Sequence, residues 1–197
     1  MISRRSFLKS AAIAGTGAAV LRGRAWPFAQ SPTNLRKFVT SLPGLGPSGA
    51  NEIGQYIPSA TKNTIKFAGL STDVYKLVAT KFNEKMHPDL PGRTNFFGYT
   101  DLHTFDQKYL AGVIVATRGT PVLLSVTNWL PSRHILPVDP TIMAGDNGLT
   151  VGDLPVNRIV THLHGGRTPW FSDGTPFQWF TPEGKTGESF MNVPGLP

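Results

Sequence analysis

The sequence contains no cysteine among its 197 residues. This absence excludes disulfides, thiolate catalysis, cysteine-ligated zinc, iron–sulfur clusters and any copper site that requires a thiolate ligand. Long hydrophobic runs are also lacking. The weakly hydrophobic run from Ala11 to Leu21 is too short to cross a bilayer as a helix, which takes about 20 residues. We therefore expect no transmembrane segment.

Convincing helical periodicity is also missing outside the first residues. Glycine (21 residues) and proline (17 residues) are abundant but aperiodic, which favours a turn-rich β protein. Short β-rich runs are separated by Gly/Pro turns, a pattern that predicts an all-β sandwich or barrel. The predicted strands cover residues 74–82, 95–99, 112–117, 122–128 and 158–164.

The N-terminus has the composition of a secretory signal. Residues 1–29 contain five basic residues and no acid, and Arg4 and Arg5 precede the hydrophobic run. Paired arginines at this place are typical of the twin-arginine export signal, so we expect a periplasmic or extracellular protein. A basic amphipathic helix is the alternative, but the run lacks a polar face. Residues 30–60 follow as a predicted extended arm.

The positive charge belongs mostly to this N-terminal segment. The whole chain carries a formal net charge of +7, but only 14 basic and 12 acidic residues remain after residue 29. No cluster of Lys and Arg with interleaved aromatics stands among them. The sequence therefore gives little support to nucleic-acid binding.

One segment, Thr161 to Gly174, concentrates residues that can bind metal. On a strand, His162 and His164 would point to the same face, and imidazole is a ligand for copper, zinc, iron and nickel. A pair of satisfied structural histidines is the alternative, because two ligands leave a metal half-coordinated. Asp173 is either an Asx-turn residue or a functional carboxylate.

Two further groups of residues carry open interpretations. His87, His103 and His134 lie near turn-like sequence, where a solvated histidine is expected. The aromatic residues between 170 and 180 either pack a long loop onto the sheet or form the wall of a pocket. They are Trp170, Phe171, Phe177, Trp179 and Phe180.

The histidine segment closely resembles the first copper-ligand segment of multicopper oxidases, in the branch of bacterial laccases, spore-coat laccases and bilirubin oxidases. It reads RIVTHLHGGRTPWFSDGTPFQWFTPEG. Other stretches agree, namely EKMHPDLPGRTNFFGY, AGVIVATRGTPVLLSVTNWLP and LPVDPTIMAG. The resemblance covers residues 35–197 and implies a Greek-key β-sandwich of the cupredoxin (plastocyanin-like) type. Residues 61–197 would be the first such domain, incomplete at its C-terminus.

The resemblance also implies a chemistry that depends on copper. In this family a type 1 copper takes electrons from a phenolic, bilirubin-like or metal-ion donor, and a trinuclear cluster reduces O2 to water. Carried over to the matching positions, His162 would bind the type 2 copper and His164 a type 3 copper. Asp173 stands where the family has an aspartate that is thought to help proton delivery, as a carboxylate near metal-bound oxygen can.

The departures from the family pattern limit what this chain can do alone. Only the first of four histidine segments is present, and the cysteine of the type 1 site is missing. We therefore expect the N-terminal part of a copper oxidase, inactive by itself, whose partners are the remaining oxidase domains. The alternatives are an exported, non-catalytic cupredoxin that works through a partner, and a carbohydrate-binding sandwich without metal. Arg167, directly after the glycines, has no assigned role.

Overall fold

The computed structural model describes residues 34–142, 151–170 and 173–188. Internal contacts divide the chain into two units, Met1–Lys37 and Phe38–Pro197, and the account below concerns the second. The predicted export signal over residues 1–29 lies outside the described residues. Within them, no helix is long and apolar enough to cross a membrane.

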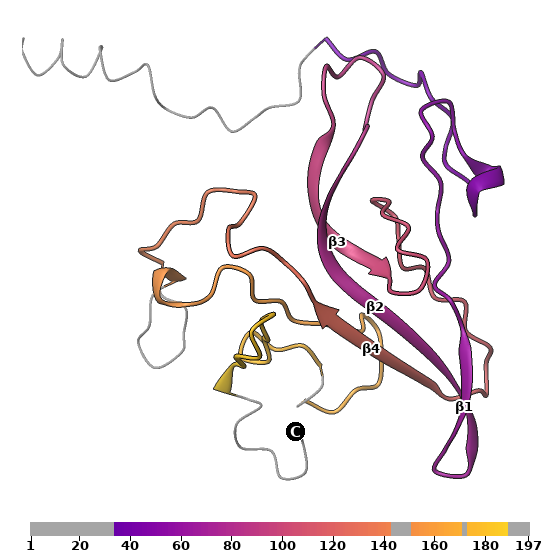
Figure 1. The fold of residues 1–197 in the computed structure, drawn as a ribbon, viewed down its shortest axis with the longest axis vertical. Helices are drawn as coiled ribbons and strands as arrows, with labels where there is room; N and C mark the ends of the chain where they lie inside the picture. Colours follow the sequence, from indigo (N-terminus) through magenta and orange to yellow (C-terminus); the bar gives the residue numbers. More distant parts are fainter. Residues whose placement is uncertain (1–33, 143–150, 171–172, 189–197) are drawn as a thin grey trace, which may run out of the picture. The chain divides into compact units, whose positions relative to one another are not determined.

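The second unit is built around one four-stranded sheet (Figure 1). Its strands are β1 (Asn63–Phe67), β2 (Leu70–Glu84), β3 (Thr94–Asp101) and β4 (Val122–Asn128). Short 3-10 turns stand outside the sheet, η2 over Pro47–Gly49 and η3 over Val151–Asp153. The all-β prediction is confirmed, whereas the Greek-key arrangement stays a prediction.

Strand β2 is the centre of the sheet because every other strand pairs with it. β1 and β3 are antiparallel to β2, and β4 is parallel to it. Asp73 and Val74 pair with both β1 and β4, and residues 77–79 pair with both β3 and β4. A strand has two edges, so β1 and β3 follow one another along one edge of β2 and β4 occupies the other.

The hairpin between β1 and β2 has a two-residue turn. Phe67 pairs with Leu70, and the residues between them, Ala68 and Gly69, have φ angles of 47° and 81°. Positive φ at both positions defines the primed turn whose twist matches that of the flanking strands. This short connection fixes the register of the hairpin.

The apolar core lies along β2, which carries most of the buried apolar side chains among the described residues. Val78 is fully buried, and Tyr75 and Leu77 are buried with it. Tyr75 also donates a hydrogen bond from its hydroxyl to the carbonyl of Val115, at 2.7 Å. Burying one such side chain contributes about 1.5–3 kcal/mol, so β2 is the main source of apolar stabilisation.

Two of the predicted strands, residues 112–117 and 158–164, do not form regular strands. Of residues 112–117, only Val113 makes a β-bridge, to Ser59, and of residues 158–164 only Ile159 does, to Phe180. The first segment is held by single contacts instead of a ladder: the N–H of Ala60 donates to the Val113 carbonyl at 2.8 Å, and the Tyr75 hydroxyl donates to the Val115 carbonyl. The second segment is braced by the loop that follows residue 173.

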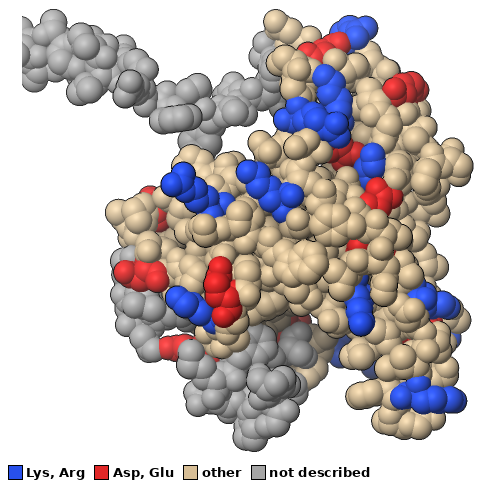
Figure 2. Space-filling view, viewed as in Figure 1, with Lys and Arg blue, Asp and Glu red and all other residues tan. Residues whose placement is uncertain are grey.

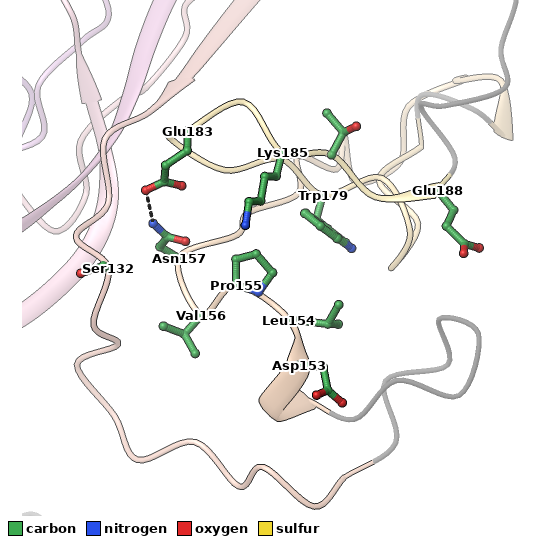
Figure 3. Close-up of a pocket in the computed structure, with 11 residues that line it drawn as sticks. Ser132, Asp153, Leu154, Pro155, Val156, Asn157, Trp179, Glu183, Lys185 and Glu188 are labelled. Carbon is green, nitrogen blue, oxygen red and sulfur yellow. Dashed lines mark hydrogen bonds between the residues drawn. The ribbon is translucent and has the colours of Figure 1, made fainter.

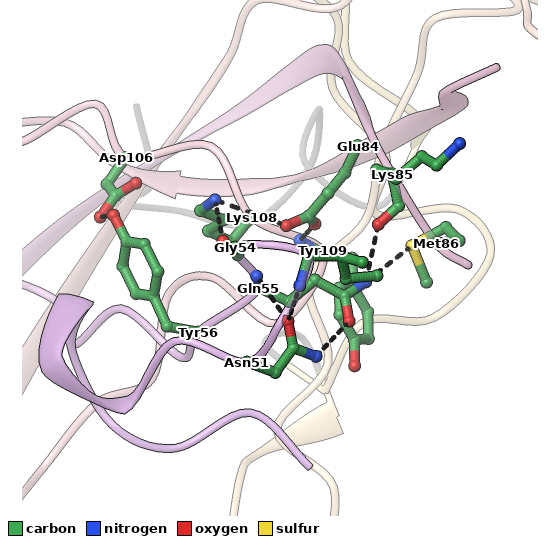
Figure 4. A network of polar contacts seen from close by, with 11 residues as sticks. Asn51, Gly54, Gln55, Tyr56, Glu84, Lys85, Met86, Asp106, Lys108 and Tyr109 are labelled. Atoms are coloured by element: carbon green, nitrogen blue, oxygen red, sulfur yellow. Dashed lines mark hydrogen bonds and ion pairs between the residues drawn. The ribbon is translucent and has the colours of Figure 1, made fainter. Parts of the chain in front are cut away.

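A buried polar network joins the predicted arm to the end of β2 (Figure 4). The Gln55 amide donates to the carbonyl of Lys85 at 2.9 Å, and Asn51 accepts from the Gln55 backbone at 2.9 Å. Glu84 is 3% exposed; it accepts from the backbone N–H of Tyr109 at 2.7 Å, and Lys108 lies 3.6 Å from its other oxygen. These contacts hold residues 51–55 against the sheet.

The same network includes Tyr56, which donates to Asp106 from its hydroxyl (Figure 4). This hydrogen bond to a carboxylate raises the pKa of Tyr56 to about 12. Lys108 stands over the Tyr56 ring, 4.6 Å from its centroid. A cation over an aromatic face is attracted to it, so Tyr56 and Lys108 hold each other in place.

Asp101, at the end of β3, is the most deeply buried carboxylate of the described residues, with 1% of its surface exposed. It accepts hydrogen bonds from Thr61 Oγ1 at 2.7 Å, from Thr61 N at 3.2 Å and from Thr104 N at 3.0 Å. Burial raises the pKa of Asp101, but these hydrogen bonds outweigh it, so the pKa lies below its ordinary value of 3.8. The carboxylate thereby joins the segment before β1 to the turn after β3.

Charged side chains are spread over the visible face of the molecule. Figure 2 shows Lys and Arg interspersed with Asp and Glu, separated by wide uncharged areas. Mixed charge of this kind produces no strong field of one sign over that face.

Candidate metal-ligating site

The structure places the rings of His162 and His164 next to each other. Their centroids are 5.7 Å apart, the ring planes meet at 65°, and both residues are exposed. The segment is not a regular strand, so the alternation of a strand does not produce this arrangement. The chain instead leaves the bridge at Ile159 and turns at Gly165, where φ is 74°.

His162 has its tautomer fixed by a backbone contact. Its Nδ1 lies 2.6 Å from the carbonyl oxygen of Asp173, and a carbonyl only accepts, so Nδ1 carries the hydrogen. In the neutral ring this leaves the lone pair on Nε2. A histidine that donates one ring N–H to a backbone carbonyl keeps its other nitrogen as an acceptor, as metal-ligating histidines usually do.

The Asp173 carboxylate lies beside the same ring. Its Oδ1 is 3.4 Å from His162 Nδ1 and accepts a hydrogen bond from Thr168 Oγ1 at 2.7 Å. About half of the Asp173 side chain is exposed to solvent. The structure therefore brings together all three residues singled out in the sequence, with Asp173 on the His162 side.

Gly174 allows the loop to come this close to the histidines. Its φ is +78°, and an added Cβ would collide with the carbonyl oxygen of Thr161 and lie 2.9 Å from the Cβ of His162. A glycine here satisfies both the positive φ and the close backbone approach. Sequence reasoning placed Asp173 and Gly174 in a turn but did not foresee that the turn packs on His162.

Two buried amides that the sequence analysis did not single out hold the loop. Gln178 accepts hydrogen bonds from the N–H groups of Gly174 and Thr175, at 2.7 and 2.8 Å. Asn128, at the end of β4, donates to the carbonyls of Asn157 and Phe180, at 2.8 and 3.0 Å. Both segments of the site are thus connected to the sheet through side-chain amides.

The aromatic residues of this loop divide between the interior and the surface. Trp179 is buried, whereas Trp170 is 68% exposed. Phe171 lies outside the described residues. The burial of Trp179 agrees with the first of the two interpretations, in which these aromatic residues pack a long loop onto the sheet.

Trp179 also lines a cavity of about 590 Å³ (Figure 3). Acidic side chains of Asp153, Glu183 and Glu188 surround it together with Lys185, and Glu183 accepts from the Asn157 amide at 3.2 Å. A second cavity, of about 390 Å³, is lined by His134 and Arg158 among apolar residues. Neither of these two cavities is lined by His162, His164 or Asp173, and both histidines are exposed.

Of the three histidines expected to be solvated, His103 and His134 are exposed and His87 is partly buried, and all three have local partners. His87 accepts from the Asp89 backbone, His134 accepts from the Leu136 backbone, and His103 contacts the Asn63 amide, all at 3.0–3.1 Å. Arg167 is exposed, and nothing in the described structure explains it.

The donor atoms of the pair fit part of a copper site. Imidazole nitrogen is a good ligand for copper, and His162 presents Nε2 with its orientation fixed. Among the described residues, no group of three or more histidine, aspartate or glutamate side chains could hold a metal ion by itself. The pair therefore suits a metal that takes further ligands from elsewhere.

The fold and the site define an all-β protein that carries two adjacent, exposed histidines, one of them oriented by a backbone carbonyl. No family model matches the chain. It is 33% identical to a laccase of Haloferax volcanii over 95% of its length, and 34% identical to a laccase of Bacillus stratosphericus over 75%. It is also 40% identical, over 54% of its length, to multicopper oxidase LPR1 homolog 1 of Oryza sativa.

These similarities show that the chain belongs to the multicopper oxidase family, and with the sheet they make its domain cupredoxin-like. The matches cover 29%, 24% and 17% of the three relatives. The chain therefore spans less than a third of the length of the curated relatives it matches.

Proposed function

We propose that this chain contributes the first two histidine ligands of the trinuclear copper cluster of a laccase-like oxidase. His162 would bind the type 2 copper and His164 a type 3 copper. The observation that carries the proposal is the juxtaposition of the two rings, with His162 Nδ1 donating to the Asp173 carbonyl at 2.6 Å. Family membership supplies the identity of the metal.

The bound copper ions would supply the electron transfer that reduces O2 to water, with electrons from a phenolic, bilirubin-like or metal-ion donor. The residues of this chain have simpler tasks. His162 and His164 would donate nitrogen lone pairs, and the Asp173 carbonyl, by accepting from Nδ1, would keep the lone pair of His162 on Nε2. Asp173 holds or releases a proton at Oδ1, beside His162 and open to solvent, since O2 reduction consumes protons.

The partners of the chain in this function are the remaining domains of the oxidase, which would provide the other copper ligands. The paired arginines before the hydrophobic run support export by the twin-arginine route to the periplasm or the cell exterior. Residues 61–197 would then be the first cupredoxin domain of the exported protein.

Copper titration tests the histidine pair directly. We expect the metal-free chain to bind Cu(II), and His162→Ala/His164→Ala to bind it at least about tenfold more weakly, because both imidazole ligands are lost. Isothermal titration calorimetry provides the measurement. The matched control is His87→Ala/His103→Ala, which removes two histidines with local partners and should leave the affinity unchanged. Equal binding by the wild type and by the variant of the pair would refute the assignment.

An oxidase assay tests the dependence on other domains. With copper added, the 197-residue chain should show negligible oxidation of a phenol or dye, because no cysteine is present for a type 1 copper. Oxygen uptake with a full-length laccase as positive control is the measurement. Turnover comparable to that of the full-length laccase would contradict the expectation.

A further inference from the structure

We propose that Gln178 is a positioning residue that sets the tautomer and orientation of His162 through the peptide group between Asp173 and Gly174. The effect on the ring concerns this chain alone, and only its consequence for copper rests on the proposed function. Gln178 never touches the imidazole. It acts on the backbone group that does.

The Asp173–Gly174 peptide group is held at both ends. Its carbonyl oxygen accepts from His162 Nδ1 at 2.6 Å, and its N–H donates to Gln178 Oε1 at 2.7 Å. A hydrogen bond to the N–H of a peptide polarises its carbonyl and makes that oxygen a better acceptor. The glutamine amide, the peptide and the imidazole therefore form one chain of hydrogen bonds.

The contacts of Gln178 allow only one orientation of its amide. Oε1 accepts from the N–H groups of Gly174 and Thr175, whereas Nε2 donates to the carbonyl of Trp170 at 3.0 Å. Reversing the amide would set donor against donor and acceptor against acceptor. The side chain thus connects the carbonyl of Trp170 to the N–H groups of Gly174 and Thr175 in a single arrangement.

Burial makes these contacts hard to replace with water. Gln178 is 3% exposed. If the side chain were apolar, the N–H groups of Gly174 and Thr175 would lose their acceptor, and the loop would have to move to reach solvent. Because an added Cβ at Gly174 would already collide with the His162 segment, the loop cannot move toward the histidines and must move away from them.

The tautomer of His162 reports this positioning without any metal. We expect ¹H–¹⁵N spectra of the histidine side chains, recorded well above the usual histidine pKa of about 6.5, to show His162 protonated at Nδ1. In Gln178→Leu the Asp173–Gly174 peptide loses its contact with Gln178, and its carbonyl is free to move away from His162. The His162 ring should then change to a mixture of the Nδ1–H and Nε2–H forms. Gln178→Met keeps the length of the side chain but removes the acceptor of both N–H groups, so the tautomer should change in the same direction.

Gln55→Leu is the matched control for a merely structural effect. Gln55 is also a buried amide with backbone partners, at the far end of β2, so its loss destabilises the fold without contacting the histidine loop. Its His162 signal should equal that of the wild type. An unchanged tautomer in Gln178→Leu overturns the proposal. An unchanged tautomer in Gln178→Met overturns it too, so the test stands even if Gln178→Leu does not fold.

Copper affinity provides the second measurement. The metal-free chain should bind Cu(II) about tenfold more weakly in Gln178→Leu than in the wild type, the usual effect of removing an outer partner of a histidine ligand. Unchanged affinity together with a changed tautomer would contradict this consequence. If His162→Ala/His164→Ala bound copper as tightly as the wild type, the proposed function would fail. The tautomer result would still decide the role of Gln178.

Discussion

Alanine in place of Gly174 is expected to separate the Asp173 loop from His162 and to destabilise the chain by about 3 kcal/mol or more. Two effects combine: a residue with a Cβ is strained at a φ of +78°, and that Cβ would overlap the Thr161 carbonyl. The free energy of unfolding in urea measures the first consequence. Loss of the Nδ1–H form of His162 measures the second.

Gly184→Ala separates strain from collision. Gly184 has nearly the same φ, +81°, but an added Cβ would meet no atom within 4 Å. This variant should lose only about 1–2 kcal/mol, the cost of positive φ for alanine, and His162 should be unaffected. Equal losses in both variants would mean that the loop does not pack on the histidine segment.

Leucine at Asp101 is expected to destabilise the chain by about 3 kcal/mol or more. The carboxylate is almost fully buried and is the acceptor for two groups of Thr61 and for the Thr104 N–H, and all three donors would lose it. Urea unfolding at neutral pH is the measurement. Asp139→Leu is the control, because Asp139 accepts from Thr141 in the same way but is exposed, so a much smaller loss is expected.

The free energy of unfolding at acid pH should also depend on the Asp101 carboxylate. Because the pKa of Asp101 is lowered in the folded chain, its charge stabilises the fold above pH 3.8, and this contribution is lost as the pH falls through the folded-state pKa. Asp101→Asn removes the titrating group, so its stability should fall less steeply below pH 3.8 than that of the wild type. Parallel acid profiles would contradict the assigned hydrogen bonds.

Three of the five strands predicted from the sequence form ladders in the sheet, and the other two make only single β-bridges. The β-rich runs at residues 74–82, 95–99 and 122–128 correspond to β2, β3 and β4. Residues 112–117 are also rich in β-forming residues but make only the single bridge at Val113, because strand pairing depends on tertiary context and cannot be read locally. The short strand β1 was not named, because Ala68–Gly69 is a weaker turn signal than Asn-Gly.

The sequence indicated the histidine pair and the turn at Asp173, but not the side chains that hold them in place; metal binding by the pair stays a prediction. The spacing of His162 and His164 and the turn at Asp173 were visible in the sequence. Gln178 gives no comparable signal, since a lone glutamine among aromatic residues is most simply a surface residue. Its importance arises only when the loop folds back and its amide meets three backbone groups.

The parallel pairing of β4 with β2 also sets the order in which this chain can fold. β1 meets β2 across two residues, whereas residues 85–121 must be ordered or looped out before β4 can align with β2. Closing a long loop is slow, so the hairpin forms first and β4 docks late. Until then one whole edge of β2 stays open to other chains, which makes refolding yield sensitive to protein concentration.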